Sequence, residues 1–406
     1  MIELPEIQAA ALVVERFVRP TPHIFSYTLS QLLDRQVHLK PENLQRTGSF
    51  KLRGACNRMM ALTPEEKKGG VVAASAGNHA QGVALAAQLL QVHATVVMPE
   101  ETPLVKVERT RFLGAEVILQ GASFDESLAI ARREEARRGL TFIHGYDDER
   151  IIAGQGTVGL EILKDLPECD MVIVPVGGGG LVAGIALAMK SMRPRVRVVG
   201  VQAAGCPSAA KALEAGRPVL VEHPRTIADG IRVGQVGALP FAIIRRWVDD
   251  VVLVDDEEIS RAIVVLMEKS KLVVEAAGAV GVAALLSGKI RPEAPVVSVV
   301  LSGGNIDTNF FVRMLERGLT HEGRLVLLRV GIVDKPGQLA KVLAELATLG
   351  GNVLDVKHYR AGWQLPLEGT ELEILVETRD PDHGRQMVSR LRGAGYEVRM
   401  TGRDET

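Results

Sequence analysis

One lysine stands out as a residue that could do covalent chemistry. Lys51 lies between a Gly-Ser-Phe turn that begins at Gly48 and a helix-like stretch that contains Gly54. A lysine amine is a poor nucleophile while protonated, but desolvation lowers its pKa and frees it to condense with an aldehyde. The apolar neighbours Phe50 and Leu52 could supply that desolvation. The alternative is an ordinary surface lysine at a helix start.

A second polar segment follows the apolar run 71–74 and opens a helix-like stretch. It reads Ser75-Ala76-Gly77-Asn78-His79-Ala80-Gln81-Gly82. The first N–H groups of a helix have no partner inside it, so they bind anions well, and a substrate carboxylate would fit there. Asn78 adds a neutral side-chain donor that can hold a phenolic oxygen. The alternative is a capped turn between a strand and a helix.

Four consecutive glycines, Gly177 to Gly180, separate the apolar run 171–176 from a second apolar stretch. Glycines between a strand and a helix leave several backbone N–H groups able to converge on a phosphate. No Gly-Lys-Ser/Thr follows, so the segment is not a Walker loop, and it lacks the GxGxxG spacing of a dinucleotide site. Close packing of the helix on the strand is the alternative.

A serine follows the last strongly apolar run of the main body. The segment 301–305 reads Leu-Ser-Gly-Gly-Asn, with Ser302 directly after the run 296–301. A hydroxyl at the carboxyl edge of a parallel sheet lies where α/β proteins bind ligands. Taken alone, Ser302 would be an ordinary loop serine.

The elements that position these residues alternate between short strands and helices. Apolar, valine-rich runs at 71–74, 94–98, 171–174, 196–201 and 296–301 are separated by helix-like stretches. This alternation predicts an α/β fold with doubly wound parallel sheets whose strands are buried on both faces. We expect residues 1–40 to form a helix and a proline-rich turn that pack over this body. The uncharged run from Met171 to Met189 is long enough for a membrane span, but its proline and four glycines favour strand, loop and buried helix.

The pattern changes after residue 318. We expect a polar linker at 316–323, followed by strand, helix, two strands, helix and strand between residues 324 and 400. This βαββαβ order predicts a small α+β unit of ferredoxin-like type.

The composition describes a globular chain with no strong charge bias. It has 406 residues, 47% hydrophobic and 24% charged, and a formal net charge of −1. Nucleic acids and acidic membrane surfaces are therefore poor candidates for partners. Its three separated cysteines, the absence of a CxxC pair and the lack of a signal-like start favour a reducing cytoplasm.

Taken in order, the four motifs resemble those of fold-type-II pyridoxal-phosphate enzymes, most closely the threonine dehydratase (threonine ammonia-lyase) family. The segments Thr226–Ile231 and Val274–Ala279 are similar to that family as well, and the resemblance covers about 11–311. The tail, with Asp334-Lys335-Pro336-Gly337 and Gly351-Asn352-Val353, more weakly resembles an ACT domain. The implied organisation is a catalytic domain at 1–318, with a small subdomain at roughly 41–145, and an ACT-like regulatory or dimerisation domain at 325–406.

The resemblance implies a role for each motif with pyridoxal 5′-phosphate as cofactor. Lys51 would form the Schiff base and then remove the α-proton, and Ser302 would face the pyridine nitrogen. A serine there can leave that nitrogen neutral and the ring a weaker electron sink, which favours loss of a β-hydroxyl. The residues expected at the cofactor are Phe50, Lys51, Asn78, Gly177, Gly178, Gly179, Gly180, Leu181 and Ser302. Those expected at the substrate carboxylate are Ser75, Ala76, Gly77, Asn78 and His79.

At two places the sequence differs from racemase-like members of the superfamily. Similar serine racemases carry a second serine where this chain has Ala76, and a methyl group cannot take a proton, so we expect elimination with little racemisation. Racemase-like members bind a divalent cation through acidic residues after a strand equivalent to the one ending near Val201. Here residues 202–208 contain no carboxylate, so we expect no metal site.

Several alternatives stay open. One methyl group is worth only about 1–3 kcal/mol in a pocket, so threonine and serine are both expected substrates. The enzyme could instead prefer serine or 3-hydroxyaspartate, or the chain could be a non-catalytic amino-acid sensor. The tail could bind an amino-acid effector such as isoleucine or valine, or only join subunits of a homodimer or homotetramer.

Overall fold

The computed structural model describes residues 2–360 and 369–401. It divides into two compact units, Met1–Asp307 and Thr308–Thr406, each described by itself below. The polar linker expected at 316–323 is wrong, because helix α14 (Thr308–His321) continues through most of it. The charged residues there form the polar side of an amphipathic helix that buries Met314 and Gly318.

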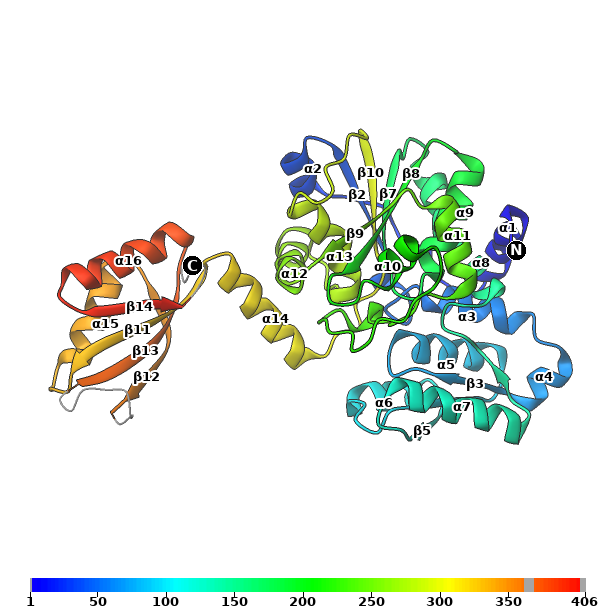
Figure 1. Ribbon diagram of the computed structural model, residues 1–406, viewed down its shortest axis with the longest axis horizontal. Helices are drawn as coiled ribbons and strands as arrows, with labels where there is room; N and C mark the ends of the chain where they lie inside the picture. Colours follow the sequence, from blue (N-terminus) through cyan, green and yellow to red (C-terminus); the bar gives the residue numbers. More distant parts are fainter. Residues whose placement is uncertain (1, 361–368, 402–406) are drawn as a thin grey trace. The chain divides into compact units, whose positions relative to one another are not determined.

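The larger sheet of the first unit has six strands in the order β1-β2-β10-β7-β8-β9 (Figure 1). All neighbours are parallel except the antiparallel β1–β2 pair. The strands are β1 (Ile24–Phe25), β2 (Gln36–Pro41), β7 (Met171–Pro175), β8 (Arg197–Ala203), β9 (Asp250–Val254) and β10 (Val296–Leu301). The doubly wound parallel sheet is therefore confirmed. The expectation for residues 1–40 is incomplete, because this segment supplies β1 and most of β2 as well as helix.

Helices cover both faces of this sheet, which explains its continuous apolar strands. In β7, Val172 and Val174 join the core formed with α9, whereas Ile173 faces Gly281 of α13 on the other side. The helices and 3-10 turns associated with this sheet are α1 (Leu4–Val14), α2 (Tyr27–Leu33), η1 (Glu42–Leu44), α8 (Glu149–Asp165), α9 (Gly180–Met192), α10 (Ser208–Ala215), η2 (Asp229–Ile231), α11 (Ala238–Trp247), α12 (Asp256–Ser270) and α13 (Ala276–Leu286). The uncharged run from Met171 thus forms a strand, a loop and a buried helix, as predicted. None of the helices in residues 2–360 and 369–401 is long and apolar enough to cross a membrane.

The smaller sheet of the same unit has four parallel strands in the order β5-β4-β3-β6. Its strands are β3 (Val71–Ala74), β4 (Ala94–Met98), β5 (Glu116–Leu119) and β6 (Thr141–Phe142). Val71 and Ala73 pack with the helices on one face, and Val72 and Ala74 pack against α7 on the other. The helices of this part are α3 (Lys51–Met60), α4 (Pro64–Gly69), α5 (Asn78–Leu90), α6 (Leu104–Phe112) and α7 (Phe124–Arg138).

The second unit contains an antiparallel sheet in the order β12-β13-β11-β14. Its remaining elements are β11 (Leu325–Val333), α15 (Gln338–Thr348), β12 (Asn352–Tyr359), β13 (Gly369–Glu377), α16 (Pro381–Gly393) and β14 (Glu397–Thr401). Val342 and Leu346 of α15 and Leu391 of α16 share one apolar core with the sheet. The predicted βαββαβ order and the small ferredoxin-like α+β unit are confirmed.

Candidate active site

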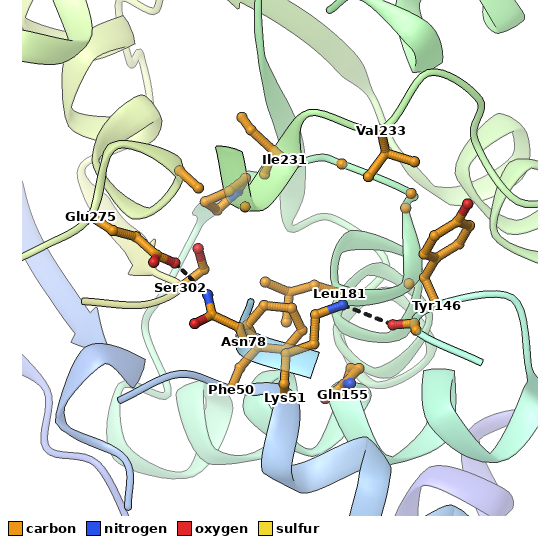
Figure 2. Close-up of a pocket in the computed structure, with 18 residues that line it drawn as sticks. Phe50, Lys51, Asn78, Tyr146, Gln155, Leu181, Ile231, Val233, Glu275 and Ser302 are labelled. Atoms are coloured by element: carbon orange, nitrogen blue, oxygen red, sulfur yellow. Dashed lines mark hydrogen bonds between the residues drawn. The ribbon is translucent and has the colours of Figure 1, made fainter. Parts of the chain in front are cut away.

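A pocket in the first unit collects residues from elements far apart in the sequence (Figure 2). Of the residues predicted at the cofactor, Phe50, Lys51, Asn78, Gly177, Gly178, Gly179, Gly180, Leu181 and Ser302 all line it. The sequence analysis missed the pocket residues Tyr146, Gln155 and Val233. It noted the segments that contain Gly230, Ile231 and Glu275 as similar to the family but assigned these residues no role. The four motifs therefore meet in one place, although 251 positions separate Lys51 from Ser302 (302 − 51).

Lys51 is the first residue of α3, and its side chain reaches across the pocket. Its Nζ donates to the carbonyl oxygen of Gly145 at 2.8 Å and lies 5.1 Å from the ring centroid of Phe50. Burial lowers the pKa of Lys51 to about 8, while the Glu275 carboxylate opposes that shift. With this pKa about a tenth of the amine is uncharged at pH 7, and addition to an aldehyde requires that form.

A buried ionic cluster anchors α3 one half-turn after Lys51. The Arg53 guanidinium donates to Glu42 at 2.8 Å from both Nε and Nη2, and to Glu161 at 2.5 and 2.9 Å from Nη1 and Nη2. Lys40 of β2 donates to the same Glu161 at 2.7 Å. Although burial opposes the charge, the two carboxylates raise the pKa of Arg53 above its ordinary value. The cluster ties α3 to η1, β2 and α8.

Helix α8 also packs closely on the two helices that carry the site. A Cβ on Gly154 would lie 2.6 Å from the Cα of Gly54 in α3. A Cβ on Gly156, one half-turn further along, would lie 2.8 Å from the carbonyl oxygen of Gly184 in α9. These close approaches require glycine, and they fix α3 and α9 on a common support.

The glycine loop connects β7 to α9 and lines the pocket. Gly179 has φ of +94°, and a Cβ there would lie 2.8 Å from Pro240. A Cβ on Gly178 would collide with the ring of Tyr146, so only glycine fits where this ring packs on the loop. The loop lines the pocket, and the first N–H groups of α9 have no partner within the helix, so the segment fits a phosphate group.

Ser302 follows β10 at the carboxyl edge of the larger sheet, and only 3% of it is exposed. The backbone N–H of Phe50 donates to the Ser302 carbonyl oxygen at 3.2 Å. Ser49 and Gly303 form an antiparallel bridge beside this contact. The turn that carries Lys51 is therefore attached directly to the segment that carries the predicted pyridine-nitrogen ligand.

Asn78 is the first residue of α5, and partners hold both ends of its amide. Its Nδ2 donates to Glu275 Oε1 at 2.6 Å (dashed in Figure 2), and its Oδ1 accepts from Asn305 Nδ2 at 2.8 Å. Burial and the nearby Asp229 raise the pKa of Glu275 to about 8, although the bond from Asn78 opposes the shift. The sequence signal for Glu275 was a lone acid within an otherwise uncharged stretch, 272–286.

The rest of the predicted substrate loop lies outside the pocket lining. Ser75, Ala76, Gly77 and His79 precede or follow Asn78 but are not among the residues that border the pocket. The Ser75 hydroxyl accepts from the N–H of Gly77 at 3.1 Å, so that N–H is already engaged. The His79 ring bonds the Ile143 carbonyl oxygen at 2.9 Å, and burial, followed by the charge of Lys51, lowers its pKa to about 3. His79 is thus a neutral, satisfied core histidine.

Beside the pocket, an ion pair joins the two halves of the first unit, which are the parts built on the smaller and on the larger sheet. Lys106 of α6 donates to Asp229 of η2 at 2.7 Å, and Gly230 and Ile231 next to Asp229 line the pocket. Among residues 2–360 and 369–401 there is no group of three or more metal-ligating side chains.

The arrangement has clear counterparts among known proteins. Residues 14–302 match the family model described as pyridoxal-phosphate dependent enzyme. The chain belongs to this family. It is thus an enzyme that uses pyridoxal phosphate, and the pocket fits that cofactor, with a buried amine, a lining glycine loop and a nearly enclosed serine.

Individual relatives are similar over much of the chain. An L-threonine ammonia-lyase of Thermotoga maritima is 47% identical over 99% of this chain and all of its own length. One of Geobacter sulfurreducens is 47% identical over 98% of this chain and 99% of its own. Among solved structures, the processed threonine deaminase isoform 2 of Solanum lycopersicum superposes with a TM-score of 0.74 at 38% identity, covering 77% of this chain and 86% of its own. Maize serine racemase gives 0.74 at 35% identity, covering 79% and 99%.

Proposed function

We propose that the protein is an L-threonine ammonia-lyase, which eliminates water from L-threonine to form an enamine that takes up water again and hydrolyses to 2-oxobutanoate and ammonia. L-serine would give pyruvate in the same way. The observation that carries the proposal is the meeting of Lys51, Asn78, the glycine loop and Ser302 in one pocket. The full-length similarity to two L-threonine ammonia-lyases supports the choice of substrate.

Lys51 serves first as the attachment point for the cofactor and then as the base. Bound pyridoxal phosphate supplies an electron sink that stabilises the charge left on the substrate α-carbon. When its amine is not bound to the cofactor, Lys51 would remove the α-proton of the substrate. A pKa of about 8 suits this role, because a general base works best when its pKa lies near the working pH.

The other pocket residues would bind and orient the cofactor and the substrate. The backbone of Gly177 to Gly180 and Leu181 would hold the phosphate, and Phe50 would pack beside the ring. Asn78 would donate to the ring hydroxyl oxygen, and Ser302 would face the pyridine nitrogen without protonating it. The first N–H groups of α5, which follow Gly77, would bind the substrate carboxylate.

The similarity to serine racemase favours racemisation as a second candidate activity. A racemase needs a second base on the opposite ring face, and the position that would supply it here is Ala76. We therefore assign elimination as the main reaction and racemisation as at most a minor one.

A keto-acid assay tests the assignment. Wild-type protein and the Lys51→Ala and Lys51→Arg variants would be incubated with threonine, serine and 3-hydroxyaspartate. Wild type should form 2-oxobutanoate from threonine, and both variants should lose at least about a thousandfold in rate, because the nucleophile and base are one residue. Lys51→Arg keeps the positive charge, so it separates loss of chemistry from loss of charge. Equal rates in wild type and variants, or colourless protein that makes no keto acid, would overturn the proposal.

The second unit is proposed to be an ACT-like regulatory or dimerisation domain, with boundaries near 325–406, following a catalytic domain at 1–318. The effector would be a branched-chain amino acid, the assembly a homodimer or homotetramer, and the location the cytoplasm. Regulation requires a ligand that binds two states with different affinity. Titrating isoleucine and valine into the threonine assay tests it, and unchanged activity at saturating ligand would leave only the dimerisation role.

A further inference from the structure

Glu275 occupies a position where its carboxyl group is not needed for the helix that it precedes. It is the N-cap residue of α13, yet its side chain makes no capping hydrogen bond. Only 3% of the residue is exposed, and its neighbours in sequence are apolar. A buried carboxyl group that does not cap its helix calls for another role, since burial of such a group is costly.

The carboxyl group instead points at Asn78 in the pocket, as Figure 2 shows. Asn78 Nδ2 donates to Glu275 Oε1 at 2.6 Å, and the backbone N–H of Asn305 also bonds the carboxylate. On the other side, Asn305 Nδ2 donates both to Asn78 Oδ1 at 2.8 Å and to the carbonyl oxygen of Thr47 at 2.6 Å.

This chain of bonds fixes which way the Asn78 amide faces. Asn305 Nδ2 is a donor to the carbonyl oxygen of Thr47, so the Asn78 atom beside it must be the acceptor oxygen. The amide nitrogen of Asn78 therefore lies toward Glu275, with one of its two hydrogens used there and one remaining. The Glu275 carboxyl group is thus the acceptor that holds that nitrogen in place.

The backbone around the carboxyl group is shaped to receive it. A Cβ on Gly303 would collide with Glu275 Oε1, and one on Gly230 would lie 3.4 Å from the same atom. Two glycines from different elements thus leave just enough room for this oxygen.

We propose that Glu275 is a positioning residue, which aims the second N–H of Asn78 at the ring hydroxyl oxygen of bound pyridoxal phosphate and tunes that hydrogen bond through its own charge. The proposal rests on the assignment of Asn78 to the ring hydroxyl under the proposed function. Glu275 itself need not touch the substrate or take part in proton transfer.

The charge of Glu275 changes in the physiological range. Burial, followed by Asp229 of η2, raises its pKa to about 8, while Asn78 of α5, Lys106 of α6 and the Asn305 backbone act in the opposite direction. Lys51 of α3 also senses the charge of this carboxyl group. Below pH 8 the carboxyl group is mainly neutral, and above it the new negative charge draws on the Asn78 amide and weakens its second N–H as a donor.

The visible absorbance of the bound cofactor reports this bond, because it depends on the charge at the ring hydroxyl oxygen. Wild-type holoenzyme should show a spectral change with a midpoint near pH 8 that is absent from, or moved by at least about one pH unit in, Glu275→Gln. Glu275→Gln should also bind the cofactor about tenfold more weakly, because the amide group that it introduces presents a donor where the Asn305 N–H needs an acceptor.

Two further variants complete the test. Glu108→Gln removes an exposed carboxylate that pairs with Arg111 on α6, and it should titrate like wild type. Glu275→Asp keeps the carboxyl group but is one methylene shorter, so it should keep a titration while losing cofactor affinity. If Glu275→Gln does not fold, the comparison of Glu275→Asp with wild type still tests whether Glu275 positions Asn78.

The outcomes separate this inference from the proposed function. An unchanged spectral midpoint and cofactor affinity in Glu275→Gln, or in Glu275→Asp where the glutamine variant fails to fold, overturns the role of Glu275, even where the enzyme makes keto acid from threonine. Conversely, wild type that binds pyridoxal phosphate with the expected titration but forms no keto acid overturns the proposed reaction and leaves the role of Glu275 standing.

Discussion

Replacing Arg53 by methionine tests whether the buried ionic cluster holds the helix that begins at Lys51. Arg53 and Glu42 are both 0% exposed, so the variant leaves the Glu42 carboxylate buried beside the Thr21 hydroxyl, a neutral donor that cannot balance its charge. Glu161 is 25% exposed and retains Lys40 at 2.7 Å, so it is affected less. Removing one partner of a buried pair costs about 3–5 kcal/mol, and we expect a loss in that range.

The same helix provides a matched control. Arg58 of α3 pairs with Asp148 at 3.1 Å, but both side chains reach solvent, at 19% and 23% exposure. An accessible ion pair of this kind contributes about 0–1 kcal/mol, so Arg58→Met should be nearly neutral. The two variants remove the same charge from the same helix and differ in the burial of the partner that is left behind.

The assay is urea unfolding of cofactor-free protein, since ligand binding would add its own stabilisation. Fluorescence of Trp247 in α11 reports on the first unit when every variant carries Trp363→Phe, which removes the second tryptophan of the chain. The double variant Arg53→Met/Glu42→Gln should lose less than the sum of its single changes, because the stranded charge is gone. A loss below about 1 kcal/mol for Arg53→Met, equal to that of Arg58→Met, would refute the reasoning.

Three further outcomes are expected at the pocket. Cofactor-free enzyme should take up pyridoxal phosphate faster as pH rises through about 8, because the Lys51 amine is neutral above its lowered pKa; stopped-flow absorbance measures this, and a midpoint near 10.5 would contradict it. Gly179→Ala should weaken phosphate-dependent cofactor binding at least about tenfold, since φ of +94° and a Cβ 2.8 Å from Pro240 both oppose a side chain. Ala76→Ser should gain serine racemisation, measured by chiral chromatography, and no gain would count against Ala76 as the missing base position.

The sequence predicted the parts of the fold in which the buried residues are apolar. Valine-rich strands alternate with helices, and both sheets follow from that alternation. Strand β2 was missed because its segment contains His38 and Lys40, which are unusual in a buried parallel strand. Lys40 is 0% exposed, and its ammonium group pairs with Glu161 of α8, 121 positions away. No local pattern can reveal such a partner.

The candidate site shows the same limit. The motifs around Lys51, Asn78, the glycine loop and Ser302 could be found because special backbone or reactive groups mark them locally. Glu275 could not be assigned, since a lone acid before a helix is equally typical of an N-cap. Its contact with Asn78 spans 197 positions and exists only after the two sheets have assembled.

Helix α8 explains how site residues that belong to two different sheets keep fixed positions relative to one another. Lys51 begins α3, next to the smaller sheet, whereas the glycine loop begins α9, on the larger one. If the sheets alone positioned these elements, any shift between them would separate the amine from the phosphate site. Instead α3 and α9 both pack on α8, through Gly154 and Gly156, within about one half-turn of each other. The distance between the amine and the glycine loop is therefore set by one rigid helix, whereas the Lys106–Asp229 pair that joins the two halves beside the pocket is partly exposed and constrains them less.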